Sequence, residues 1–362
     1  MSFQKIDKRD LYRCVSCGNC RSVCPVFEQT GKESKNTRGR ILVIRDVYEG
    51  KLSDDSVFDS INTCTTCGYC TEACPAGVHP PELVEAARNG LVSQGKMTPT
   101  QKKIFETVRQ YSNTLGDSGD RLEWLKGSGL QIPKKAEAVY FVGCLDTYRY
   151  PETALKTYAL LNKMGVGLLE DEKCCGSPLL RLGFDAGDLM KHNANQIKKS
   201  GAKTIISGCA GCYNTLKNNY SLTGCQSVTV SEYLAANLKD LKKTGLKKLN
   251  LKVTYHDPCH AGRHNRVFDE PRQIIREICG AENFIEMKNI REKSRCCGGG
   301  GGVRSGYNEL SISMAKKRIE DAPKDIDYIV TTCPLCLRNL RDANGSIPVI
   351  DLIELVSMAL EK

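Results

Sequence analysis

The placement of cysteines constrains this chain more than any other feature of its sequence. Eighteen of its 20 cysteines fall into four regularly spaced sets. The N-terminal residues MSFQKIDKRD contain no apolar stretch, so we expect no secretory signal. In a reducing compartment this density of cysteine indicates metal binding or catalysis rather than a disulfide scaffold.

Two front segments repeat the pattern C-x2-C-x2-C-x3-C-P, at residues 14–25 and 64–75. The pattern is typical of dicluster ferredoxins, in which three close cysteines and one from the other segment hold each 4Fe–4S cubane. A pair of zinc sites is the alternative, but zinc motifs usually combine two short CxxC hooks. The predicted ligand sets are Cys14, Cys17, Cys20 and Cys74 for one cluster, and Cys64, Cys67, Cys70 and Cys24 for the other.

The second half of the chain carries two sets of five cysteines, each built around a Cys-Cys-Gly triplet and a later CxxC. A cubane needs only four thiolates. The fifth thiolate therefore indicates a more open cluster, whose iron can bind a substrate sulfur. The two sets are Cys144, Cys174, Cys175, Cys209 and Cys212, and Cys259, Cys296, Cys297, Cys333 and Cys336.

Strand and helix patterns alternate around both five-cysteine sets, which predicts parallel α/β units. Ligands in such sheets lie beyond the carboxyl ends of the strands, where these cysteines fall. We expect an α-helical dicluster ferredoxin-like domain followed by two pseudo-repeated α/β lobes that face each other. The predicted boundaries are 1–100 for the ferredoxin-like domain, 101–136 for a helical connector, and 137–250 and 251–362 for the lobes.

The chain resembles the heterodisulfide reductase family over nearly its whole length. Both five-cysteine sets, the segment HDPCH at residues 256–260 and the run CCGGGGGV at residues 296–303 carry the resemblance. A ferredoxin-like domain fused to two CCG lobes is similar to the D subunit of that family, which is equivalent to its C and B subunits joined. The resemblance implies four 4Fe–4S clusters, two cubane and two noncubane.

The resemblance also implies a function. In that family the disulfide of coenzyme M and coenzyme B is split between the two noncubane clusters by two one-electron steps, with electrons supplied through the cubanes. A membrane b-type cytochrome or a soluble flavoprotein would then be the electron-donating partner, because no flavin or nicotinamide motif is visible. The alternative is an electron-transfer subunit of a flavin-linked 2-hydroxy acid dehydrogenase or a related respiratory complex. Neither five-cysteine set lacks a ligand, which favours disulfide chemistry.

Five further side chains are candidates for contact with substrate. Arg181, Arg263 and Arg304 lie just beyond cluster ligands and are predicted to clamp sulfonate or phosphate groups, although each is also compatible with a solvated surface arginine. His256 and His260 flank Cys259 and are candidate proton donors to a released thiolate; a histidine bonded to backbone is the alternative.

The formal net charge of +10 does not indicate a nucleic-acid partner, because no basic tail or aromatic stripe accompanies it and bound clusters add negative charge. No run approaches the about 18 apolar residues that a membrane-spanning helix requires. We expect a cytoplasmic protein, with a peripheral position at the cytoplasmic membrane left open. Cys225 and Cys279 fall outside every set and are predicted to be ordinary buried thiols.

Overall fold

The front domain of the computed structural model, which describes residues 3–52 and 57–361, is entirely helical. Short helices alternate with the cysteine loops, and two longer helices, α4 and α7, pack their apolar faces together around Ile41, Ile44 and Leu83. The elements are α1 (Lys8–Tyr12), α2 (Asn19–Ser22), α3 (Pro25–Thr30), η1 (Glu33–Lys35), α4 (Thr37–Tyr48), α5 (Phe58–Asn62), α6 (Tyr69–Glu72) and α7 (Pro80–Ser93).

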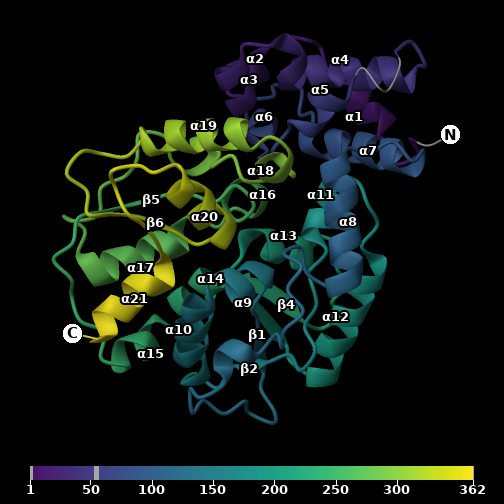
Figure 1. Ribbon diagram of the computed structural model, residues 1–362. Helices are drawn as coiled ribbons and strands as arrows, with labels where there is room; N and C mark the ends of the chain where they lie inside the picture. The colour runs from purple at the N-terminus through teal and green to yellow at the C-terminus, as the bar shows by residue number, and fades with distance from the viewer. Residues whose placement is uncertain (1–2, 53–56, 362) are drawn as a thin grey trace.

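A connector leads from the front domain to the first lobe. Helix α8 (Pro99–Tyr111) begins with a capping box in which Thr98 and Gln101 satisfy each other's backbone N–H groups. An irregular segment with the short helix η3 (Glu123–Leu125) follows, and Trp124 in it packs edge-on against Tyr158 of the first lobe. Figure 1 shows α8 descending from the front domain alongside that lobe.

The first lobe is a four-stranded parallel sheet in the order β2-β1-β3-β4, with helices on its faces. Strands β1 and β3 are almost completely buried, as expected for a parallel sheet covered on both sides. The elements are β1 (Ala138–Phe141), α9 (Cys144–Arg149), α10 (Pro151–Asn162), β2 (Gly167–Leu168), α11 (Ser177–Leu182), α12 (Gly187–Ser200), β3 (Thr204–Ser207), α13 (Ala210–Asn218), β4 (Gln226–Thr229), α14 (Val230–Ala236) and α15 (Leu238–Lys243).

The second lobe repeats this strand order as β5-β6-β7, all parallel. An isolated bridge from Val253 to Phe284 takes the place that β2 occupies beside β1. The elements are β5 (Val253–Tyr255), α16 (Gly262–Asn265), α17 (Asp269–Cys279), η4 (Arg291–Lys293), α18 (Val303–Gly306), α19 (Asn308–Ile319), β6 (Tyr328–Thr331), α20 (Pro334–Asp342), β7 (Val349–Asp351) and α21 (Leu352–Glu361).

One hydrophobic core joins the two lobes. It includes Tyr158 and Leu161 of α10, Ile274 of α17 and Leu355 of α21, all fully or nearly fully buried. The lobes therefore pack as one body, with the front domain lying across both of them (Figure 1). The expected order of a helical dicluster domain and two α/β lobes is confirmed. Within the described ranges, no helix is long and apolar enough to cross a membrane.

Candidate active site

Two small cavities in the front domain are lined by the two predicted cubane ligand sets. Cys14, Cys17, Cys20 and Cys74 line one, and Cys24, Cys64, Cys67 and Cys70 line the other, with Cys70 also reaching the first. The loops have matching backbones: Gly18 and Gly68 both have a positive φ, at 86° and 75°, which a glycine adopts without strain. The crossed pairing of the sequence pattern therefore corresponds to two compact groups of thiols.

The two front sites differ in their environment. Cys17 is exposed, whereas Cys67 and Cys70 are buried. We call the group of Cys24, Cys64, Cys67 and Cys70 the inner front site. The fully buried guanidinium of Arg40 lies beside it, with its Nη1 atom 3.7 Å from the Sγ atom of Cys24. Its other donors bond the carbonyl oxygen of Ser60 and the hydroxyl of Thr63. A positive charge held here offsets the negative charge of thiolates removed from water.

A cavity of about 400 Å³ lies where the two lobes and α8 meet. Its walls come from the carboxyl ends of strands in both lobes, as expected for parallel sheets. Nine of the ten cysteines of the five-cysteine sets line it, and only Cys296 does not: Cys144, Cys174, Cys175, Cys209, Cys212, Cys259, Cys297, Cys333 and Cys336.

Contacts between thiols connect the groups in series. Cys296, the cysteine outside the cavity, contacts Cys67 of the inner front site, and this contact together with burial raises the pKa of the Cys67 thiol. Between the lobes, the thiol of Cys209 contacts that of Cys333. The inner front site therefore adjoins the second five-cysteine site, which in turn adjoins the first.

The glycine run after the second Cys-Cys pair packs backbone against backbone on the inner front loop. A Cβ atom on Gly300 would lie 2.7 Å from the carbonyl oxygen of Thr65, and one on Gly301 would lie 2.2 Å from that of Cys64. No side chain fits in this contact. Close approach of the two backbones therefore explains why this run consists of glycine.

His256 lies behind the cysteines and does not line the cavity. Its Nδ1 atom accepts a hydrogen bond of 2.9 Å from Nε of Arg318, and its buried Nε2 atom has no hydrogen-bond partner. A ring nitrogen and the Sγ atoms of Cys297 and Cys336 all lie within 4.8 Å of one another. Burial, reinforced by the Arg318 charge, lowers the pKa of His256 to about 3. The structure thus places His256 beside Cys297 and Cys336 and outside the wall of the cavity in which a substrate thiolate would lie.

His260 does line the cavity. Its Nδ1 atom lies 3.4 Å from the Sγ atom of Cys259, and its buried Nε2 atom is unpartnered. The ring stacks on that of His264 with centroids 4.7 Å apart, and Nε2 of His264 donates to the carbonyl oxygen of Thr66. Burial and the positive groups nearby hold the pKa of His260 well below its usual range.

The arginines predicted to clamp substrate differ in placement. Arg181 and Arg304 line the cavity, but Arg181 pairs with Glu85 at 2.5 Å and Arg304 pairs with Asp342. Arg263 is absent from the cavity wall, because its guanidinium bonds the carbonyl oxygens of Cys67 and Ser294. Arg263 therefore holds two backbone carbonyl groups beside the predicted ligands and does not reach the cavity.

Arg338 is a cavity residue that was absent from the sequence-based candidates, although it lies only two residues after Cys336. It is half-buried, and among the described residues its guanidinium has neither a carboxylate nor a hydrogen-bond partner. Arg338 could have been predicted from the sequence, because it follows a predicted ligand closely, as Arg181, Arg263 and Arg304 do.

The first lobe has its own buried ion pair beside its cysteines. Glu172 accepts from the backbone N–H groups of Val142 and Gly143 and pairs with Arg121 at 2.6 Å. Nη2 of Arg121 also lies 3.7 Å from the Sγ atom of Cys144. Arg121 belongs to the irregular connector, where no sequence pattern marked it.

These donor sets fit the clusters that the sequence implies. Thiolates are the ligands of iron–sulfur clusters, and two groups of four and two of five converge here from different loops. The buried, unpartnered Nε2 atom of His256 points to a missing acceptor next to the cysteines, because buried polar groups in native proteins are almost always bonded.

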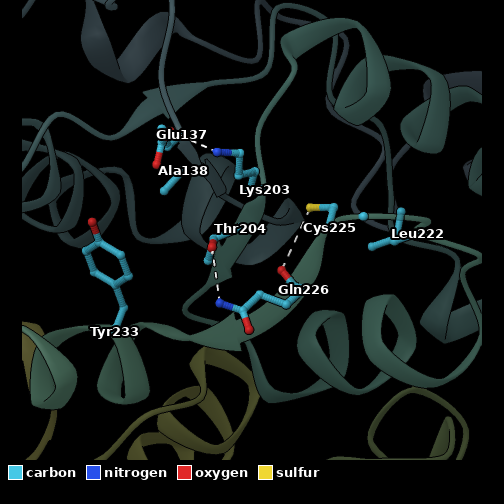
Figure 2. Close-up of a pocket in the computed structure, with 9 residues that line it drawn as sticks. Glu137, Ala138, Lys203, Thr204, Leu222, Cys225, Gln226 and Tyr233 are labelled. Atoms are coloured by element: carbon cyan, nitrogen blue, oxygen red, sulfur yellow. Dashed lines mark hydrogen bonds and ion pairs between the residues drawn. The ribbon is translucent and has the colours of Figure 1, made fainter.

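A second cavity, of about 690 Å³, lies at the opposite end of the first sheet. Figure 2 shows Glu137 paired with Lys203, and Gln226 bonded to Thr204, beside Cys225. These residues stand at the amino ends of β1, β3 and β4, far from the cysteine edge. The cavity includes none of the eighteen cysteines of the four sets. Cys225 is half-buried and Cys279 is buried.

Comparison with known proteins agrees with this arrangement. The cysteine-rich CCG domain family matches residues 138–217 and 253–341, and the 4Fe–4S dicluster domain family matches residues 10–78.

Relatives match the chain over almost its full length. The D subunit of the dihydromethanophenazine:CoB–CoM heterodisulfide reductase of Methanosarcina mazei is 36% identical, over 97% of this chain and 94% of its own length. The B subunit of the fumarate reductase (CoM/CoB) of Methanothermobacter marburgensis is 33% identical, over 98% and 73%. The EtfAB:quinone oxidoreductase of Syntrophomonas wolfei is 29% identical, over 98% and 59%. The chain is thus an iron–sulfur electron-transfer subunit of heterodisulfide reductase type, and it belongs to the family of heterodisulfide reductase D subunits, which are oxidoreductases.

Proposed function

We propose that this chain is the catalytic subunit that reduces a disulfide with anionic ends, and that its substrate is the heterodisulfide of coenzyme M and coenzyme B. The observation that carries the proposal is the shared cavity, because thiols of both five-cysteine sites line one space with an unpaired guanidinium. A disulfide placed there lies between the two sites.

The cysteines supply the cluster ligands in this proposal. The two front groups would hold cubanes, and the two sets of five would hold the noncubane clusters. When bound, the four clusters supply the one-electron steps in which two electrons and two protons convert the disulfide into two thiols. The chain itself holds the substrate, excludes water from the cavity and keeps the two sites at a fixed spacing.

Arg338 is the residue proposed to bind an anionic end of the substrate. No carboxylate pairs with Arg338 among the described residues, whereas the other two cavity arginines are each paired with one. The charge of Arg338 is therefore available to a ligand. A guanidinium bonds a sulfonate or phosphate through two parallel N–H groups, which orients the ligand as well as attracting it. Arg181 and Arg304 would add long-range positive charge but fewer free donors.

His260 is proposed to stabilise a thiolate product by a hydrogen bond rather than by giving up a proton. Its ring lines the cavity with Nε2 unpartnered, and in the neutral tautomer that carries the hydrogen on Nε2 it can donate to a thiolate. A neutral imidazole donates a hydrogen bond well but is a poor acid. The protons that complete the reaction would then come from solvent at the cavity mouth.

The exposed front site is the proposed entry point for electrons. Cys17 is exposed, and the adjoining Val15 retains 69% of its accessible surface. An electron-donating partner, whether a membrane b-type cytochrome or a soluble flavoprotein, would dock over this loop. The contact between Cys67 and Cys296 supports a path from the front domain into the lobes.

A second candidate function is electron transfer to a quinone from a flavin-linked dehydrogenase. The similarity to the quinone oxidoreductase of Syntrophomonas wolfei favours it. Apolar side chains of the cavity, such as Ile104, Leu115 and Leu335, are compatible with a quinone ring.

The experiment that separates these functions uses the holoprotein with reduced viologen as electron donor. We expect oxidation of the viologen on addition of the heterodisulfide, and a new paramagnetic signal when coenzyme M or coenzyme B is added to the oxidised protein. Turnover with a quinone but not with the heterodisulfide, together with no thiol-induced signal, would overturn the proposal.

A further inference from the structure

The ring orientation of His256 is fixed by its neighbours. Arg318 is always protonated and donates from Nε to Nδ1 of His256, so Nδ1 must be the acceptor nitrogen. Arg318 is itself held by Asp321 at 2.9 Å and by the carbonyl oxygen of Asn289 at 2.7 Å. The proton of the neutral ring is therefore on Nε2.

The imidazole of His256 lies close to the sulfurs of the second five-cysteine site, and Nδ1 is already bonded to Arg318, so Nε2–H is the donor left for them. This N–H group is buried, it has no hydrogen-bond partner, and the ring lies within 4.8 Å of the Sγ atoms of Cys297 and Cys336. An unmet N–H donor is costly in a buried site, and buried donors in native proteins are almost always bonded. The Sγ atoms of Cys297 and Cys336 are potential acceptors close to this ring.

The first lobe lacks this donor. Three residues before Cys144 lies Phe141, the counterpart of His256 before Cys259. Phe141 is completely buried in one apolar cluster with Cys175 and Cys212, which correspond to Cys297 and Cys336. The same place beneath each site thus holds a phenyl ring in one lobe and an N–H donor in the other.

We propose that Nε2–H of His256 donates a hydrogen bond to a sulfur on the Cys297 and Cys336 side of the second five-cysteine site and raises the reduction potential of that site. The proposal rests on the cluster assignment made above. One electron adds negative charge to the sulfurs, and the donor stabilises that charge. No proton moves, because Nε2 keeps its hydrogen in both redox states. His256 is a positioning and tuning residue, not a catalytic one.

The test is a redox titration of the holoprotein followed by EPR, comparing wild type with His256→Phe. The variant reproduces the ring of the first lobe. We expect a tenfold loss in the equilibrium constant for one-electron reduction of one cluster, which is a shift of about 59 mV to more negative potential. His256→Gln, which can still donate an N–H, should recover part of the shift.

Phe141→Leu is the matched control, because it disturbs the packing beneath the first site without removing a donor. We expect no shift in that variant. A His256→Phe protein that retains its iron and its wild-type potentials would overturn the proposal. If the site of the hydrogen bond is correct but heterodisulfide turnover is absent, the potential still shifts, so failure of the proposed function is distinguishable.

A second measurement does not depend on the folding of the variant. In wild-type protein labelled with ¹⁵N-histidine, we expect a magnetic coupling between a histidine nitrogen and a paramagnetic cluster. His260 and His264 are two other imidazoles near the predicted ligands, so the same coupling should persist in labelled His260→Phe and His264→Phe proteins. Its disappearance in either variant would assign the coupling to that histidine and refute the proposal.

Discussion

The two lobes share a strand order and a five-cysteine pattern, yet they support their cysteines by different means. In the first lobe Phe141 packs beneath the site and Glu172 caps the loop before Cys144. In the second lobe His256 lies beneath the site, and Asp257 forms a buried pair with Arg272. The five cysteines are the same in both lobes, but the side chains that surround them differ. The repeated fold therefore positions two similar sites in different electrostatic environments.

The largest effect should follow from removing one cysteine from each lobe. We expect Cys175→Ser and Cys297→Ser each to lose about a quarter of the iron, because each set is proposed to hold one of four clusters. Both variants should also lose heterodisulfide reduction, because the sites share one cavity. Iron and sulfide analysis and the viologen-linked assay measure these outcomes.

Different effects of the two cysteine substitutions on turnover would show that the two lobes do not contribute equally to the reaction. If Cys175→Ser retained turnover at the wild-type rate, the first site would be dispensable for the chemistry and the substrate would not lie between two equal partners.

The buried pair of the second lobe should matter next. Asp257 and Arg272 meet at 2.6 Å with side chains 2% and 0% exposed. Asp257→Asn removes one of the two carboxylates that pair with the buried Arg272 guanidinium, the other being Glu286 at 2.7 Å, so we expect a loss of about 3 kcal/mol in the free energy of unfolding. Thermal unfolding of the holoprotein tests this loss.

The control is Asp269→Asn, which breaks the solvent-exposed pair with Arg291. It should cost no more than about 1 kcal/mol. Equal destabilisation by the two variants would show that burial does not distinguish them.

Arg338 offers a smaller and more specific effect, because the equivalent position of the first lobe, two residues after Cys212, is Asn214. Arg338→Gln removes a charge-assisted hydrogen bond to the substrate. A loss of about 1.5–3 kcal/mol corresponds to a rise in KM of about 10- to 100-fold. The exposed Arg149→Gln is the control. A fall in kcat with an unchanged KM would contradict a binding role.

The smallest effect should come from the two cysteines outside the sets. Cys225 belongs to the cavity at the opposite end of the first sheet, which none of the predicted cluster ligands lines. Cys225→Ser should leave the iron content unchanged and alter the free energy of unfolding by no more than about 0.5 kcal/mol. Loss of iron would reveal a ligand that the cysteine pattern does not include.

Cysteine spacing and strand–helix alternation predicted the order of the domains and the edge at which the cysteines meet. These features are local in sequence, because the apolar pattern of a single segment is enough to identify a strand that ends on a cysteine. The sharing of one cavity followed from the expectation that the lobes face each other.

The supporting side chains were not predictable in the same way. Arg121 contacts Cys144 and Arg318 contacts His256, in each case from a separate segment of the chain. No spacing rule identifies such partners. His256 and Arg263 were selected for proximity in sequence to a ligand, but the direction of a side chain depends on which neighbours already occupy its hydrogen bonds. For both residues, buried partners decided the outcome.

The backbone contact between Gly300, Gly301 and the Cys64–Thr65 loop has a consequence for divergence within the family. Main chain packed against main chain fixes the distance between these two loops, and so would fix the gap between the clusters proposed to lie on them. Substitutions in the surrounding side chains cannot widen that distance unless they first displace the backbone. Surfaces for different partners and linings for different substrates could therefore change while the distance between the two loops stays the same.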